Sequence, residues 1–234
     1  EDPVSNVLKW VLLAVAVICF GILGWVTVLT YRDAPPFPDS FVRSDGTVLM
    51  SADDIVRGKE GFQKADLMDY GSLYGMGSYF GEDYTADNLV RLGKLTEANI
   101  ARSRYGQALD TLPTAERAVV KAEMQSVLQG VDLTQKKVVV PDALAEAITT
   151  RRAQITQSLL HHDFARGWTQ AYSLDETSAG YTADFLLYSS LTTVARRPGT
   201  DASWTQNWPF EPLVGNTPTT STFRWTWILS LIHI

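Results

Sequence analysis

The pattern of hydrophobic positions opens with one long apolar run, from Val7 to Leu29, in which Lys9 is the only charged residue. About 20 apolar residues in a helix, at about 1.5 Å each, cross the roughly 30 Å of bilayer hydrocarbon. Trp10 lies near one boundary of the run, and Trp25 and Arg32 lie near the other, as in membrane helices. A cleaved signal peptide is the alternative, but its apolar part is shorter and ends at small residues. We therefore predict an uncleaved transmembrane anchor.

Beyond the anchor, short strand-like segments and segments with helical periodicity follow one another. A turn at Asp45–Gly46 separates two predicted strands, and Pro141 ends a third. The predicted strands cover residues 41–43, 47–49 and 137–140. The predicted helices cover residues 51–64, 85–105, 111–129, 142–166 and 182–196. Ser51 is the expected cap of the first helix and the segment Thr85–Asn88 that of the second. In the third helix, the residues expected to face inward are Val119, Val120, Val127 and Leu128.

Two segments break this pattern. The glycine- and tyrosine-rich stretch Tyr70–Gly81 contains too many glycines for a regular helix. The apolar run Phe223–Ile234 has 12 residues, which are too few to cross a bilayer. This last run is either a buried helix or a truncated membrane span.

Composition narrows the possible functions of the water-exposed part. The net charge of -6 and the pI near 5.1 argue against nucleic acid as a partner, because its phosphates need clustered Lys and Arg. The single cysteine, Cys19, lies inside the anchor, so the water-exposed part has no disulfide, thiolate metal site or catalytic thiol. A short N-terminal tail before a large acidic region favours a location of that region outside the cytoplasm.

Two clusters contain residue types that bind metals. His161–Asp163 holds two adjacent histidines, but adjacent helical positions point in different directions, and partly charged His also suits a helix C-terminus. The pair Glu82–Asp83 and Asp87 could bind calcium, although acids just before a helix also suit its N-terminus. The sequence contains neither a nucleophile elbow nor a complete dinucleotide fingerprint. Composition and spacing alone therefore indicate no enzyme.

Three stretches taken together are more specific. The first comprises Gly61–Gln63, Leu67–Tyr79 and Asp83–Asp87, the second is Arg197–Asp201 and the third is Asn207–Thr219. In order and spacing they resemble the N-terminal region of quinol-dependent nitric oxide reductases, the single-chain members of the haem-copper oxidase superfamily. The resemblance covers nearly the whole chain, and the third stretch is the most specific part of it.

The resemblance implies a cytochrome c-like domain that has lost its haem. Covalent haem needs a Cys-x-x-Cys-His run, which the sequence lacks. By the resemblance, Leu67, Tyr70 and Gly71 replace the haem-attachment residues, and bulky Leu67, Met68 and Tyr70 are expected to fill the space of the porphyrin. The expected fold is mainly α: an N-terminal transmembrane helix, a haem-less cytochrome c-like helical domain with a few short strands, and the start of a second transmembrane helix.

The same resemblance divides the chain into three parts. Residues 1–32 are expected to form the transmembrane anchor, residues 33–216 the extracytoplasmic domain, and residues 217–234 the truncated start of the catalytic membrane bundle. The tail 229–234 does not resemble the continuation seen in the family, so we interpret it as a truncation or a foreign tail. His233 is accordingly not treated as a ligand.

One metal site follows from the resemblance. In the two-subunit relatives, a Gly-x-Tyr just after the haem motif reaches a calcium ion near the catalytic haems. Here the carbonyl oxygen of Gly77 and the phenol oxygen of Tyr79 would take that role, and both are suitable hard ligands. A tight turn with a packed tyrosine is the alternative. No catalytic residue is expected in this segment.

The resemblance also implies a function for the parent protein. It would reduce two NO molecules to N2O with electrons from a membrane quinol, using haem b, haem b3 and non-haem iron held beyond this segment. The segment would anchor and cap the catalytic bundle on the outer face of a bacterial or archaeal cytoplasmic membrane. Its expected partners are membrane lipid, the bundle of the same polypeptide and, through the parent, quinol. An NO-dismutating relative and a membrane-tethered binding or sensor module are the alternatives.

Overall fold

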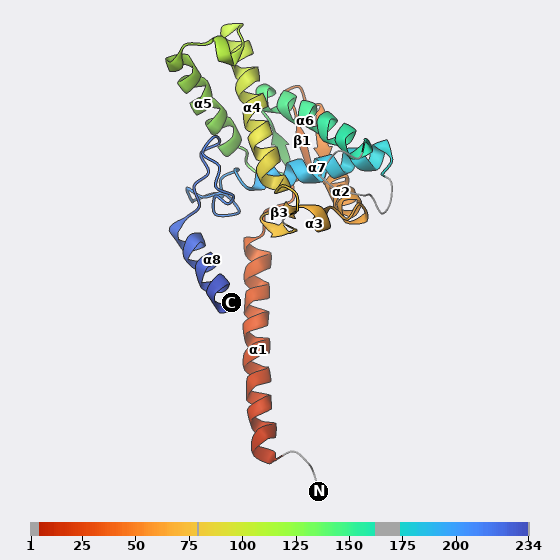
Figure 1. Ribbon diagram of the computed structural model, residues 1–234, viewed down its shortest axis with the longest axis vertical. Helices are drawn as coiled ribbons and strands as arrows, with labels where there is room; N and C mark the ends of the chain where they lie inside the picture. Colours follow the sequence, from red (N-terminus) through yellow and green to blue (C-terminus); the bar gives the residue numbers. More distant parts are fainter. Residues whose placement is uncertain (1–4, 79, 162–173, 234) are drawn as a thin grey trace. The chain divides into compact units, whose positions relative to one another are not determined.

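The computed structural model describes residues 5–78, 80–161 and 174–233 of the chain (Figure 1). The chain divides into two compact units, Glu1–Pro35 and Pro36–Ile234. The first unit contains one helix, and the second contains all the other helices and strands found in the described residues. Each unit is described by itself.

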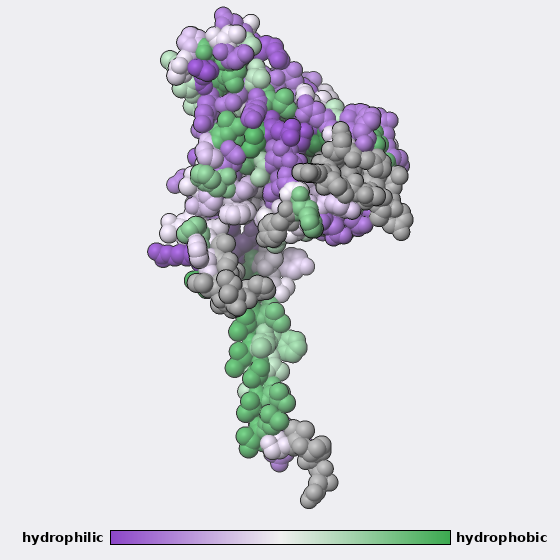
Figure 2. Space-filling view, viewed as in Figure 1, coloured by the Kyte–Doolittle hydropathy of each residue, from purple (hydrophilic) through white to green (hydrophobic). Residues whose placement is uncertain are grey.

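The first unit is the helix α1 (Asn6–Asp33), which begins after Ser5, whose hydroxyl accepts a hydrogen bond from the Leu8 amide (3.2 Å). None of its residues is buried, and Figure 2 shows its surface as largely hydrophobic. Among the described residues, α1 is the one helix long and apolar enough to cross a membrane. A helix satisfies all its backbone hydrogen bonds internally, as lipid requires. The predicted apolar helix is confirmed, and its composition fits membrane anchoring.

A three-stranded sheet begins the second unit. Its strands, in spatial order, are β2 (Val48–Ser51), β1 (Ser40–Val42) and β5 (Lys137–Val139). β1 pairs antiparallel with β2 and parallel with β5. The predicted Asp45–Gly46 turn connects β1 to β2, and Gly46 has a φ of +88°, a conformation that glycine adopts without steric cost. Phe41 and Val138 are paired across β1 and β5, and both are buried in the core.

Helices supply most of the core. They are α2 (Ala52–Lys64), α3 (Leu67–Tyr70), α4 (Tyr84–Tyr105), α5 (Thr114–Gln129), α6 (Asp142–Leu160), α7 (Glu176–Thr192) and α8 (Thr220–His233), with a 3-10 turn at Leu109–Thr111. α4, α6 and α7 pack against one another, α2 packs along α7, and α5 packs on α4 (Figure 1). The prediction of a mainly α fold with a few short strands is confirmed.

The contact between α2 and α7 depends on a glycine. A methyl group at Gly58 would lie 1.9 Å from the carbonyl oxygen of Tyr181, so only a residue without a side chain allows the two backbones to approach this closely. One turn further along, the rings of Phe62 and Phe185 pack with centroids 5.5 Å apart. These contacts hold α2 against α7, although the two helices lie far apart in the sequence.

The cap of α2 agrees with the prediction from the sequence, and the cap of α4 differs from it. Ser51 caps α2 as predicted, because its hydroxyl accepts a hydrogen bond from the Asp54 amide (3.2 Å). At α4 the cap is Asp83 rather than the predicted segment Thr85–Asn88, since the Asp83 carboxylate accepts a hydrogen bond from the Ala86 amide (2.9 Å). Asp and Thr have similar preferences for the cap position, and here Asp83, which comes first in the sequence, is the residue that caps the helix.

Three further expectations change in detail. On α5 the predicted inward-facing residues Val120 and Leu128 are buried, but the prediction is wrong for Val119, which is 44% exposed. α7 begins at Glu176, earlier than predicted. The helix predicted over residues 142–166 is present to Leu160, and its last predicted residues lie outside the described part of the chain.

The final apolar run forms α8. Phe223, Trp225 and Trp227 are 62%, 60% and 56% exposed, so the described side chains exclude a buried helix. α8 has 14 residues, fewer than the roughly 20 that a membrane span needs. The start of a second transmembrane helix therefore stays a prediction.

Candidate functional site

The glycine- and tyrosine-rich stretch folds into a small hairpin. Its strands, β3 (Ser72–Leu73) and β4 (Met76–Gly77), are joined by Tyr74 and Gly75. Both connecting residues have positive φ, 57° for Tyr74 and 78° for Gly75, as a two-residue turn of type I′ requires. Glycine adopts this conformation freely, whereas a tyrosine is strained there and must be held by its surroundings.

Tyr74 is held by hydrogen bonds to three other parts of the unit. Its amide donates to the Thr85 hydroxyl at the start of α4 (3.0 Å), and its own hydroxyl lies 3.0 Å from that of Thr192 at the end of α7. Its carbonyl oxygen accepts a hydrogen bond from the indole nitrogen of Trp208 (3.1 Å). Burial raises the pKa of Tyr74, so the phenol stays protonated at neutral pH. The hairpin is thus fixed to α4, α7 and the loop 204–216.

Asp83 holds the hairpin and caps α4 with the same carboxylate. It accepts hydrogen bonds from the Ser72 hydroxyl (2.8 Å), the Gly75 amide (2.5 Å), the Ala86 amide (2.9 Å) and the Thr85 hydroxyl. A carboxylate has about four acceptor sites, and donors occupy this number here. Asp83 is therefore a structural acceptor, which favours the helix-start interpretation over calcium binding.

The next acid along the chain, Asp87, is neutralised by arginines. Asp87 accepts from Arg91 (2.7 Å) and from Arg151 (2.9 Å), and Arg151 is buried and donates also to Asn88 (2.7 Å). Burial raises the pKa of Glu82. Among the described residues, no group of three or more His, Cys, Asp or Glu side chains could hold a metal ion. Within the predicted acidic cluster, Asp87 thus belongs to an ion-pair network, whereas Asp83 is held by hydroxyl and amide donors.

His161 ends α6, and its Nδ1 lies 2.8 Å from the carbonyl oxygen of Gln157. This position favours the helix-end interpretation of His161. The other two members of the predicted cluster, His162 and Asp163, lie outside the described residues.

The loop 204–216 is fastened to the helices behind it. The Gln125 side chain of α5 donates to the Leu213 carbonyl (2.8 Å), and the buried Asn216 side chain donates to the Thr193 carbonyl just after α7 (2.8 Å). The first bond satisfies a backbone carbonyl of the loop, and the second ties the loop to the end of α7. The loop therefore has a fixed conformation although it has no regular secondary structure.

The second stretch packs on the same loop. The Arg197 guanidinium lies over the Trp204 ring, 5.4 Å from its centroid, and the Arg197 amide donates to the Ala202 carbonyl (2.9 Å) to close a turn. Together with the bond between Trp208 and Tyr74, this contact brings the three stretches singled out in the sequence to one end of the unit. We call the surface formed by residues 72–78, 197–201 and 204–216 the junction.

The positions that the resemblance aligns with haem attachment serve packing. Leu67 is fully buried, and its carbonyl accepts a hydrogen bond from the Tyr84 hydroxyl (2.9 Å). Tyr70 packs against the core, whereas Met68 is 40% exposed and does not fill it. A methyl group at Gly71 would lie 2.5 Å from the Tyr84 ring. None of these residues carries a thiol, and the chain's single cysteine lies in α1, so they do not fit a covalent c-type haem.

Of the two predicted calcium ligands, only Gly77 is described. It has a φ of +135°, and a methyl group there would lie 2.5 Å from the Gly71 carbonyl oxygen, so a glycine is required by the close packing of the hairpin. The next amide, that of Ser78, donates to the same Gly71 carbonyl (3.0 Å). Tyr79 lies outside the described residues. Calcium binding by Gly77 and Tyr79 stays a prediction.

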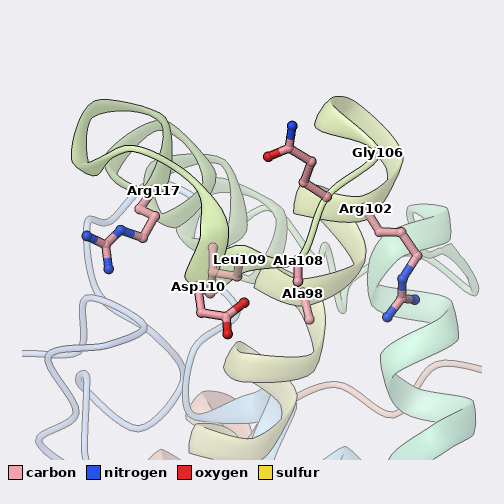
Figure 3. Close-up of a pocket in the computed structure, with 8 residues that line it drawn as sticks. Ala98, Arg102, Gly106, Ala108, Leu109, Asp110 and Arg117 are labelled. Carbon is pink, nitrogen blue, oxygen red and sulfur yellow. The ribbon is translucent and has the colours of Figure 1, made fainter.

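A hollow in the surface lies away from the junction, between the end of α4 and the connection to α5 (Figure 3). It measures about 720 Å³ and is open to solvent. Arg102 and Arg117 lie on opposite sides of it, with Asp110 between them. The two cations do not converge on one point, so this hollow is not a candidate site.

One buried ion pair has no counterpart among the sequence-based predictions. Asp184 of α7 is fully buried and accepts two hydrogen bonds from Arg152 of α6, at 2.6 and 2.9 Å. Burial raises the pKa of Asp184 to about 6, although the guanidinium opposes this change. The two residues are 32 positions apart in the sequence, so no local pattern signals their contact.

Comparison with known proteins gives one result. The family model of the NorB cytochrome c-like domain of nitric oxide reductase matches residues 38–210. This range includes the hairpin, the second stretch and the first part of the third. A search of curated proteins found no match.

Proposed function

Since the chain belongs to the family of NorB cytochrome c-like domains of nitric oxide reductase, we propose that it is the N-terminal anchor and cap of a quinol-dependent nitric oxide reductase. The parent reaction joins two NO molecules, two electrons and two protons to give N2O and water. Haem b, haem b3 and non-haem iron in the catalytic bundle would supply the electron transfer and the chemistry at NO. The present segment would bind the outer face of that bundle.

The observation that carries the cap role is the junction. The Tyr74–Trp208 hydrogen bond and the Arg197–Trp204 contact fix three separate stretches of chain into one surface, and a surface that is ordered before binding loses little entropy on association. Under this proposal residues 33–216 form the cap, and the junction is the part of it that contacts the bundle. Residues 217–234, with α8, lead into that bundle.

The proposal places α1 in a bacterial or archaeal cytoplasmic membrane, with the second unit outside the cytoplasm. The composition of α1 supports the membrane assignment. The side is proposed from the family resemblance, because basic residues next to a membrane helix, and not the acidic residues of a large domain, set its orientation.

Electrons would pass from quinol to the bundle without crossing the cap. The haem-attachment positions carry no thiol, so the cap has no means of holding a c-type haem covalently. Calcium is a second proposed component: the Gly77 carbonyl and the Tyr79 phenol would supply two oxygen ligands, and the bundle the rest.

The decisive experiment expresses the gene with its continuation beyond residue 234 and measures NO consumption in membranes supplied with a quinol. We expect quinol-dependent conversion of NO to N2O by the longer protein and none by the 234-residue chain alone. Release of N2 and O2 would indicate the NO-dismutating relative. A stop codon at this point would indicate a tethered module, and a c-type haem spectrum or NO turnover from the chain alone would contradict the cap assignment.

The calcium component has its own test. Tyr79→Phe removes the phenol oxygen and is expected to lower the calcium content of the longer protein, while Tyr105→Phe, on α4, is expected to leave it unchanged. Equal calcium contents in all three proteins would exclude Tyr79 as a ligand.

A further inference from the structure

An apolar groove lies where the loop 204–216 meets α8. Its volume is about 510 Å³, within the roughly 300–1,000 Å³ typical of pockets for small molecules. Trp208 and Phe210 form one wall and Phe223 and Trp227 of α8 form the other. Thr217, Thr220 and Thr222, together with Pro218, line the rest. The groove therefore has an aromatic interior and threonine residues along it.

The loop side of the groove is preformed. Trp208 is held by its hydrogen bond to the Tyr74 carbonyl (3.1 Å), and the hydroxyls of Thr219 and Thr222 lie 3.0 Å apart. The Thr219 amide donates to the Gln206 carbonyl (3.3 Å), which fixes the start of α8 to the loop. The groove is thus a property of the folded unit and does not require a ligand to form.

The other faces of α8 show what kind of medium covers the groove. Successive helical positions turn by about 100°, so Trp225 and Ile228 point about 200° and 140° away from Phe223. Trp225 is 60% exposed, Ile228 44% and Phe223 62%. A single protein partner covers one side of a helix, whereas lipid surrounds it, and large apolar side chains exposed on opposite sides of a helix, as Phe223 and Trp225 are here, are typical of membranes. Because α8 forms one wall of the groove, lipid that surrounds α8 also reaches the groove.

The residues around the groove match the boundary between lipid and water. Tryptophan is enriched at this boundary, and Arg side chains near helix ends extend to the lipid headgroups. Arg224, in the first turns of α8, is exposed beside Phe223. Aromatic walls suit an acyl chain, while the threonine hydroxyls and Arg224 suit the ester and phosphate oxygens above it.

We propose that this groove is a binding site for one phospholipid, whose acyl chain lies between Trp208 and α8 and whose headgroup lies at the threonines and Arg224. The site gives the second unit a membrane contact of its own. This inference does not depend on the chemistry of the parent protein, and its test measures lipid contact alone.

The first test uses Trp208 as the reporter. The sequence has seven tryptophans, and the other six are replaced by Phe. The 234-residue chain is placed in phosphatidylcholine nanodiscs with or without bromine atoms in the upper acyl chain, where bromine quenches nearby indoles. We expect brominated lipid to lower Trp208 fluorescence, because a ring bound among acyl chains lies close to the bromine atoms. Equal fluorescence in the two lipids would overturn the proposal.

The second test avoids multiple substitutions. Phosphatidylcholine is titrated into the detergent-solubilised wild-type chain and binding is followed by native mass spectrometry. Phe210→Asp places a charge in the groove wall, and Val139→Asp is the matched control, because the two side chains are 62% and 63% exposed. We expect Phe210→Asp to weaken lipid binding about tenfold, given the cost of a charge in an apolar site, and Val139→Asp to leave it unchanged. Equal binding by both variants would overturn the assignment.

Discussion

The indole nitrogen of Trp208 donates a hydrogen bond to the carbonyl oxygen of Tyr74 across 134 positions of sequence. Tyr74 itself is strained at a φ of 57°. The bond therefore does two things: it stabilises an unfavourable turn, and it joins the hairpin to the loop 204–216. The shape of the junction depends on this pair more than on any regular element.

Removing that bond gives the first prediction. Trp208→Phe keeps an aromatic ring but leaves the Tyr74 carbonyl without this donor, so the free energy of unfolding should fall by about 1 kcal/mol. Guanidinium unfolding of the detergent-solubilised chain, followed by near-ultraviolet circular dichroism, measures the change. Phe210→Leu, on the same loop, is the control and should change stability by less than about 0.5 kcal/mol.

Leu67 provides a test of core packing at a former haem-attachment position. It is fully buried, so Leu67→Ala should lower the free energy of unfolding by about 2–5 kcal/mol through lost burial and the cavity that remains. The adjacent Met68 is 40% exposed, and Met68→Ala should cost under about 1 kcal/mol. Equal losses for the two variants would contradict the placement of Leu67 in the core.

Gly77 provides a test of close packing in the hairpin. Gly77→Ala combines a positive φ with a contact of 2.5 Å to the Gly71 carbonyl oxygen. Gly46→Ala has the positive φ alone, because nothing lies within 4 Å of its added methyl group. We expect Gly46→Ala to cost about 1 kcal/mol and Gly77→Ala clearly more, measured by the same unfolding experiment. A smaller loss at Gly77 would show that the hairpin shifts freely.

Asp184 provides a prediction about pH. Its pKa of about 6 lies above the ordinary value of 3.8, so the folded chain binds a proton at this residue more tightly than the unfolded chain does. Protonation of Asp184 therefore adds to the free energy of unfolding in full below about pH 4, and this contribution is lost as the pH rises through about 6. The difference between the two pKa values corresponds to about 3 kcal/mol. Asp184→Asn should remove this part of the stability profile.

A control for the pH experiment is available on the same helix. The pKa of Asp175 is lowered by its hydrogen bonds from the Ser178 amide and hydroxyl at the start of α7. Its contribution has the opposite sign, being present at neutral pH and lost as the pH falls through its own lowered pKa. Asp175→Asn should thus change the profile only at the acid end. A flat difference between wild type and Asp184→Asn from pH 4 to about 7 would contradict the assignment to Asp184.

Local signals in the sequence predicted local structure well. Ser51 and Asp54 are three positions apart and form the capping box at the start of α2, and the Asp45–Gly46 turn joins two strands as predicted. Val119 and Val120 of α5 were both predicted to face inward, but packing against α4 buries only Val120. Periodicity alone does not distinguish two adjacent apolar positions.

Long-range contacts could not be predicted from spacing. The resemblance singled out three stretches, but that Tyr74 would accept a hydrogen bond from Trp208 depends on how α4, α5 and α7 pack between them. The pair of Arg152 and Asp184 likewise exists only because α6 and α7 pack side by side. Such partners are set by tertiary structure, and a single sequence carries no local sign of them.

The pairing of β1 with β5 has a consequence for the order in which the protein is made. Ser40 pairs with Lys137, and the α2 residue Phe62 packs on Phe185 of α7, so the first elements of the second unit have partners that the ribosome adds much later. Contacts this distant in sequence form slowly, and a partly made chain exposes apolar surface. During synthesis β1 therefore lacks β5, and α2 lacks α7, until those later segments have been made, and the unit folds as a whole only after α7 has emerged.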